Sequence, residues 1–149
     1  MADLTKILIM NGPNLNMLGM REPGIYGALT LDDIESKCRA KCEAAGIAMD
    51  WMQSNAEAEL IDQIHAACGV YDWIIINAAG LTHTSVALRD ALALFTGDVI
   101  EVHISNTHAR EEFRHHSYLS AIAKGVVLGF GASSYTMAIS AVEDAITES

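Results

Sequence analysis

Glu101 and His103 are the two residues of this sequence whose types and spacing best suit acid–base chemistry. They lie in the apolar segment 99–104, which has the composition of a β-strand, and residues two positions apart in a strand point to the same face of a sheet. A carboxylate beside an imidazole favours the protonated ring, so the pair could serve as a general acid. The alternative is a core histidine whose hydrogen bond is satisfied by Glu101.

A second group of polar residues follows the apolar segment 7–10. Three asparagines lie within positions 11–16, and asparagines in a turn either bind nearby backbone or face a ligand. The chain then carries Arg21 and Tyr26 through a stretch rich in glycine and proline, as is typical of a functional loop. A capped turn would explain any one asparagine, but it would not explain the arginine and the tyrosine.

Polar residues also follow the apolar segment 73–76, where Asn77 and His83 lie. His83 alone could be a cap for a helix that begins near Ser85. However, the carboxyl ends of parallel strands meet at one edge of a sheet, which is where such sheets bind ligands. The residues expected to gather there are Asn11, Asn14, Arg21, Tyr26, Asn77, His83, Glu101, His103, Ser105 and Asn106.

The elements that must position these residues are five short apolar segments that alternate with helical patterns. The predicted strands span residues 7–10, 47–53, 73–76, 99–104 and 126–128. Such alternation with short connections predicts an α/β fold with a parallel sheet and right-handed crossovers. We expect a flavodoxin-like, doubly wound, five-stranded parallel sheet in three α/β/α layers, formed by a single catalytic domain over residues 1–149.

Local patterns place several helix ends. Thr30 and Asp33 have the spacing of a capping box, and Gly46 is a natural end for the helix that follows. The segment 54–57 has the same capping-box pattern. We also expect a helix over 110–114 and a last helix whose apolar stripe includes Tyr135, Ile139, Val142 and Ile146.

The charge of the chain restricts its partners. A net charge of −10 would repel a nucleic-acid backbone, so we expect no nucleic-acid partner. The one basic cluster consists of Arg110 and Arg114 beside His108, His115 and His116. That cluster is the right size for a small anion.

Other kinds of site find weaker support. The histidines and cysteines show none of the spacings typical of zinc ligands, so we expect no metal. No lysine lies at the expected carboxyl edge, where a Schiff-base enzyme would need one. The segment 129–133 could bind an anion at a helix N-terminus, but it lacks the third glycine of the dinucleotide fingerprint.

The three cysteines, Cys38, Cys42 and Cys68, are expected to be reduced core residues. No basic segment precedes an apolar one near the start, and no apolar run approaches the ~20 residues that cross a bilayer. We therefore expect a cytoplasmic protein with no membrane partner.

Taken together, the motifs of this chain closely resemble those of the type II 3-dehydroquinate dehydratases. The resemblance covers almost the whole sequence, in the segments 11–19, 21–27, 53–55, 82–85, 101–106 and 110–114. It implies a flavodoxin-like fold, no cofactor, and a homo-oligomer in which trimers group into a dodecamer. It also implies the reversible anti elimination of water from 3-dehydroquinate, through an enolate, to give 3-dehydroshikimate.

The resemblance also implies a role for individual residues. Tyr26 would be the base, Arg21 would lower its pKa, and Asn14 would hold the water that stabilises the enolate oxygen. His103, oriented by Glu101, would protonate the departing hydroxyl. The residues implied in binding the substrate are Asn77, His83, Ile104, Ser105 and Arg114, with Asp90 reaching the site of a neighbouring subunit.

Ala78, Leu81 and Ser134 differ from many members of this family, which have a proline, an aromatic residue and a glycine there. The alternative function is a flavodoxin-like binding module for a phosphate or a nucleotide. In that case Asn14 and the segment 131–133 would hold the anion.

Overall fold

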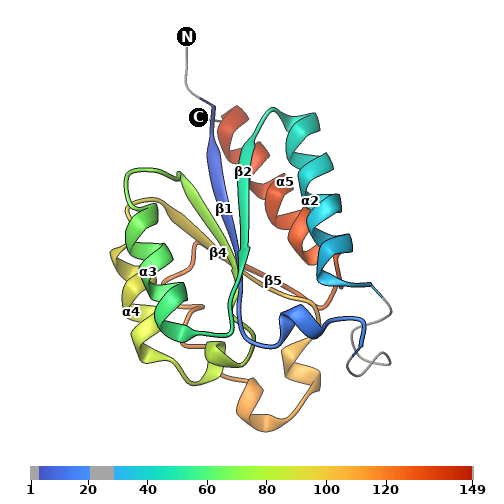
Figure 1. The fold of residues 1–149 in the computed structure, drawn as a ribbon, viewed down its shortest axis with the longest axis vertical. Coiled ribbons are helices and arrows are strands. Elements are labelled where there is room, and N and C mark those ends of the chain that lie inside the picture. The colour runs from blue at the N-terminus through green and yellow to red at the C-terminus, as the bar shows by residue number, and fades with distance from the viewer. Residues whose placement is uncertain (1–3, 21–28, 149) are drawn as a thin grey trace.

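Five parallel strands form one sheet at the centre of the protein (Figure 1). The computed structural model describes residues 4–20 and 29–148. The strands are β1 (Lys6–Asn11), β2 (Ala48–Gln53), β3 (Trp73–Asn77), β4 (Asp98–His103) and β5 (Gly125–Leu128). Their order in the sheet, β2-β1-β3-β4-β5, confirms the flavodoxin-like arrangement expected from the sequence.

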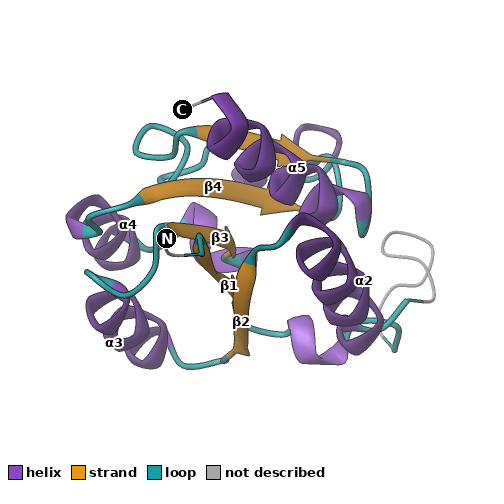
Figure 2. Cartoon of the chain, turned by 90° about the horizontal axis from the view of Figure 1, so that it is seen from above, coloured by secondary structure: helices purple, strands orange, loops and turns teal. Residues whose placement is uncertain are grey.

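Two pairs of helices cover the two faces of the sheet, as Figure 2 shows from above. These helices are α2 (Leu31–Ala45), α3 (Glu57–Ala67), α4 (Val86–Leu94) and α5 (Ser133–Glu148). Buried residues of α2 and α5 pack with one face of the sheet, and those of α3 and α4 pack with the other. The predicted three-layer α/β/α architecture is therefore confirmed.

The inner strands β1 and β3 are apolar on both faces because both faces are covered. Ile7, Ile9, Ile74 and Ile75 are inaccessible to solvent, as expected of strands in a parallel sheet between helices. Residues that alternate along β4 divide between the two cores, with Ile100 and Val102 in one and Val99 in the other. Glu101 and His103 share the face of Val99, since side chains in a strand alternate.

The capping box at the start of α2 is confirmed. The Thr30 hydroxyl accepts from the Asp33 N–H (3.2 Å), and the Asp33 carboxylate accepts from the Thr30 N–H (3.0 Å). Gly46 follows the last helical residue with a φ of 70°, a conformation that costs glycine little. The capping box and the terminal glycine can both be recognised from neighbouring residues alone.

Two local predictions are wrong. The helix α3 begins two residues later than the 54–57 pattern implies: its N-cap is Ala56 instead of Ser54, and the Ser54 hydroxyl donates to Glu59 (3.1 Å). In the segment after β4, the expected helix over 110–114 is replaced by two short 3-10 helices, η3 (Thr107–Ala109) and η4 (Glu112–Arg114). Arg110 lies between them in an extended conformation.

The cysteines are free, and two of them are core residues. Cys38 and Cys42 are at most 1 % exposed, and Cys68 is partly buried. Burial raises the pKa of Cys38 to about 12 and that of Cys42 to about 11.

Among the described residues, no helix is long and apolar enough to cross a membrane.

Candidate active site

A cavity opens at the carboxyl ends of β1, β3 and β4, next to the point where the strand order reverses. The β1 and β3 ends are tied together by a bond from the Gly12 N–H to the Asn77 carbonyl (2.8 Å). The cavity is lined by Pro13, Asn14, Leu15, Leu18, Asn77, Ala79, Gly80, His83, His103, Ile104, Ser105, Thr107, Arg110 and Arg114. It therefore brings together seven residues predicted from the sequence: Asn14, Asn77, His83, His103, Ile104, Ser105 and Arg114.

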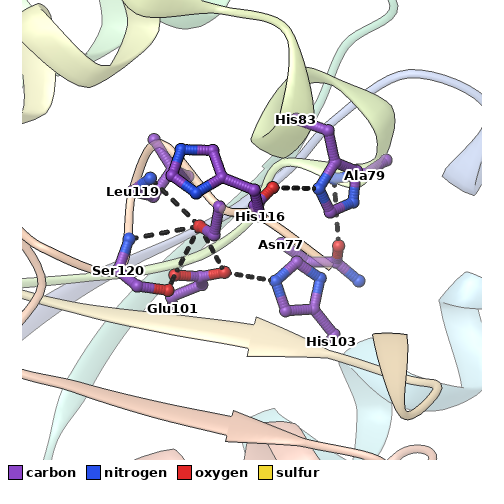
Figure 3. A network of polar contacts seen from close by, with 9 residues as sticks. Asn77, Ala79, His83, Glu101, His103, His116, Leu119 and Ser120 are labelled. Atoms are coloured by element: carbon purple, nitrogen blue, oxygen red, sulfur yellow. Dashed lines mark hydrogen bonds and ion pairs between the residues drawn. The ribbon is translucent and has the colours of Figure 1, made fainter. Parts of the chain in front are cut away.

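Glu101 and His103 form a buried pair at the end of β4 (Figure 3). The distance from His103 Nε2 to Glu101 Oε2 is 2.5 Å. An ionised carboxylate can only accept, so Nε2 is the donor and Nδ1 is the ring nitrogen left for other partners. Glu101 does not line the cavity; it lies behind His103 and orients its ring.

In His83 the other ring nitrogen, Nδ1, is the one bonded to a fixed partner. Its Nδ1 lies 2.8 Å from the carbonyl oxygen of His116, so Nδ1 carries the proton and Nε2 can accept a hydrogen bond when the ring is neutral. Burial, together with the positive charges of His103 and Arg114, lowers the pKa of His83. The rings of His83 and His103 stack with centroids 6.4 Å apart, so an imidazole whose charged form is disfavoured lies beside one that is paired with a carboxylate.

Two asparagines lie at the ends of β1 and β3. Asn14 has a φ of 73°, a left-handed conformation that asparagine tolerates better than most residues, and its N–H donates to Asn55 Oδ1 (2.9 Å). Asn77 is buried; its amide nitrogen donates to the Tyr135 hydroxyl (3.0 Å) and its oxygen accepts from the Ala79 N–H (3.1 Å). These bonds fix both residues against the cavity.

Two guanidinium groups give the cavity its charge. Arg110 reaches the Ser105 hydroxyl (3.5 Å), and Arg114 pairs with Glu111 (3.0 Å) at the more exposed side. The predicted basic cluster is thus partly confirmed, because both arginines line the cavity. No acidic residue does so in the described part of the chain, and this arrangement favours a small anion.

Some predicted residues lie elsewhere. Asp90 is on α4, where its carboxylate pairs with Arg89 (3.3 Å) and is 64 % exposed, and it is not among the cavity residues. Arg21 and Tyr26 lie outside the described residues. No group of three or more histidine, cysteine, aspartate or glutamate side chains in the described ranges could hold a metal ion.

Sequence reasoning missed three hydroxyl groups that support the site. Ser117 and Ser120 donate to Glu101, and the Tyr135 hydroxyl bonds Asn11 and Asn77. Nothing in the sequence pattern indicates the two serines, because only the fold brings them to Glu101. The pattern gives a weak indication of Tyr135, since a tyrosine on an apolar helical stripe carries a hydroxyl that needs a partner.

Fold and site together define an α/β protein with a cavity, lined by a carboxylate-bound imidazole and two arginines, at the switch point of a flavodoxin-like sheet. The model of the class II dehydroquinase family matches residues 5–143. The chain belongs to this family.

Individual relatives agree with the family match. The chain is 55 % identical over 148 residues to a 3-dehydroquinate dehydratase of Photorhabdus laumondii, covering 99 % of each chain. It is 60 % identical over 136 residues to one of Methylococcus capsulatus, covering 91 % of this chain and 92 % of the relative. The crystal structure of type II dehydroquinase from Butyrivibrio crossotus superposes with a TM-score of 0.92 at 42 % identity, covering 95 % of this chain and 99 % of the other.

Proposed function

We propose that this protein is a 3-dehydroquinate dehydratase that interconverts 3-dehydroquinate and 3-dehydroshikimate. The observation that carries the proposal is the buried Glu101–His103 pair, whose imidazole lines the same cavity as two arginines, in a chain of the class II dehydroquinase family. The substrate is an anion with hydroxyl groups, so the reaction needs positive charge, polar partners and a proton donor in one place.

His103 acts as the general acid in this proposal. Glu101 occupies Nε2, so the proton passes from Nδ1 to the departing hydroxyl, which leaves as water. The ionised carboxylate favours the imidazolium that gives up this proton. His83, whose Nδ1 is bonded to the His116 carbonyl, offers Nε2 as an acceptor for a substrate hydroxyl.

Tyr26 acts as the base that removes the proton beside the ketone, and Arg21 stabilises its phenolate. Both roles rest on the family match, which spans their positions. Asn14, at the rim of the cavity, holds the water that stabilises the enolate oxygen. Asn77, Ile104, Ser105 and Arg114 then bind the hydroxyls and the carboxylate of the substrate.

A direct assay tests the activity. We expect the protein, incubated with 3-dehydroquinate in the presence of a chelator, to produce the ultraviolet absorbance of the conjugated enone, and to keep this activity after borohydride treatment. His103→Asn should abolish most of the turnover, while His65→Asn on the surface of α3 should leave it unchanged. Absence of turnover by the unmodified protein, or a flavin that copurifies with it, would favour the alternative of a flavodoxin-like binding module.

The proposal also includes a homo-oligomer, a dodecamer of trimers in which Asp90 completes the site of a neighbouring subunit. Its support is the position of Asp90, whose carboxylate is exposed and does not line the cavity of its own chain. Light scattering measures the assembly. If Asp90 acts across an interface, refolding a mixture of Asp90→Asn and His103→Asn subunits restores activity that neither variant has alone, and a monomer in solution would contradict this role.

A further inference from the structure

Two serine hydroxyls contact the face of Glu101 that is turned away from the cavity. Ser120 Oγ lies 2.7 Å from Glu101 Oε1, and Ser117 Oγ lies 3.0 and 2.9 Å from Oε1 and Oε2. Figure 3 shows Ser120 and His103 on either side of this carboxylate. Because Glu101 is 1 % exposed, these groups replace the water that an exposed carboxylate would bind.

The backbone fixes the direction of the Ser117 hydroxyl. Its oxygen accepts from the N–H groups of Leu119 (3.0 Å) and Ser120 (3.1 Å). A hydroxyl has two acceptor positions and one proton. Since both acceptor positions are occupied, the proton can only be donated, and the acceptor within reach is Glu101.

We propose that Ser117 and Ser120 are positioning residues for the reaction, which hold Glu101 as an oriented, ionised carboxylate behind His103. With His103 they supply three hydrogen-bond donors to one carboxylate. These donors stabilise its ionised form. The step in catalysis that they support is proton donation by His103, so this inference rests on the proposed function.

The pKa of Glu101 agrees with this role. Burial raises it, but hydrogen bonds from His103, Ser120 and Ser117, together with the charge of His103, outweigh burial and hold the pKa below its ordinary value of 4.5. The other charged or titratable groups facing the pair are positive or neutral: His83 from η2 (Ala79–His83), His108 from η3, Arg114 from η4, and His115 and His116 after it. His103 also lines a second cavity, together with Glu101, Ser117 and Ser120. Among the described residues that line the two cavities, Glu101 is the one acid.

Ser120→Ala is the sharpest test, because Ser120 is exposed and lies outside the substrate cavity. The Ser120 hydroxyl bonds Glu101, and because the side chain is exposed, we expect the variant to fold. We expect kcat to fall about 10-fold, as for the loss of one hydrogen bond to a charged group, with KM almost unchanged. We also expect the ¹³C carboxyl signal of Glu101, assigned with Glu101→Gln, to titrate at higher pH than in the unmodified protein.

Three further variants separate positioning from packing. Ser120→Thr keeps the hydroxyl and should restore kcat. Ser54→Ala removes another hydroxyl that donates to a glutamate, Glu59, and should leave both kcat and the Glu101 titration unchanged. In a Glu101→Gln background, Ser120→Ala should change kcat by less than about 2-fold, because interacting residues are not additive.

The outcomes distinguish the inference from the proposed function. If Ser120→Ala has an unchanged kcat and an unchanged Glu101 titration, the positioning role is overturned while the activity stands. If the unmodified protein does not act on 3-dehydroquinate, the proposed function fails, and the carboxyl titration still decides whether the serines hold Glu101 ionised. A loss of stability with no change in that titration would show a merely structural role.

Discussion

Tyr135 donates its hydroxyl proton to Asn11 Oδ1 across 2.7 Å, although 124 positions separate the two residues. Both are inaccessible to solvent. The same hydroxyl accepts from the Asn77 amide (3.0 Å), and the Asn11 amide donates to the Met52 carbonyl (3.1 Å). One side chain of α5 thus joins the carboxyl ends of β1 and β3, and Asn11 in turn links them to β2.

We expect Tyr135→Phe to lower the free energy of unfolding by about 2 kcal/mol, because it leaves buried polar groups of Asn11 and Asn77 without a partner. Urea unfolding followed by circular dichroism measures this. Tyr71→Phe is the matched control: its hydroxyl bonds the exposed Asp50, which water can solvate, so the loss should stay below about 1 kcal/mol. Equal losses in the two variants would contradict a role for burial.

The parts of the fold that the sequence predicts are those that depend on neighbouring residues and on burial. The apolar runs of β1 and β3 and the capping box at Thr30 need no distant partner to be recognised. The parallel sheet follows from their alternation with helices, and the number of strands suggests the flavodoxin-like order. The cavity at the carboxyl edge follows from that order.

The failures have a common physical cause, which is competition from contacts that the local pattern does not include. Ser54 has the pattern of an N-cap, but its hydroxyl bonds Glu59 and the helix starts at Glu57. Arg110 lies in a segment with a helical pattern, but it is extended and its side chain lines the cavity. The donors to Glu101 come from 16 and 19 positions away, a distance at which sequence spacing carries no signal.

The capping box of α2 should make stability depend on pH. The N–H and hydroxyl of Thr30 hold the pKa of Asp33 below its ordinary value of 3.8. Because the folded pKa is the lower one, the contribution of Asp33 is fully present above pH 3.8 and is lost as the pH falls below it. The unfolding free energies of the unmodified protein and Asp33→Asn should therefore differ at pH 6 and converge below pH 3.8.

The control for this effect is Asp32→Asn, which lies in the same first turn but outside the capping box. Thr30→Ala removes the N-cap itself and should cost about 1 kcal/mol at pH 6. Chemical unfolding at several pH values gives all three comparisons. A difference between the unmodified protein and Asp33→Asn that does not depend on pH would refute the assignment.

Gly12 marks the closest approach of the β1 and β3 ends. A Cβ at this position would lie 2.6 Å from the Ala78 carbonyl oxygen, a backbone atom that cannot move aside alone. We expect Gly12→Ala to cost about 1–3 kcal/mol in unfolding free energy and to lower kcat, since the turn carries Asn14. Gly125→Ala is the control, because nothing lies within 4 Å of its Cβ position; if both variants unfold alike in urea, the crowding at Gly12 is not important.

Arg21→Ala tests the proposed base. A free tyrosine has a pKa of about 10, so ionising Tyr26 near pH 7 requires about 4 kcal/mol in favour of the phenolate. One guanidinium at about 4 Å supplies about that much at an effective dielectric constant near 20, but only about 1 kcal/mol in bulk water. We therefore expect kcat to fall by about 10²–10³-fold while KM changes less.

Arg39→Ala is the control for the loss of a positive charge, since Arg39 pairs with Glu35 on the exposed face of α2 (2.8 Å) and should keep full activity. Steady-state kinetics across pH 6–9 measures both variants, and an increase in KM with an unchanged kcat would show that Arg21 binds the substrate without activating the base.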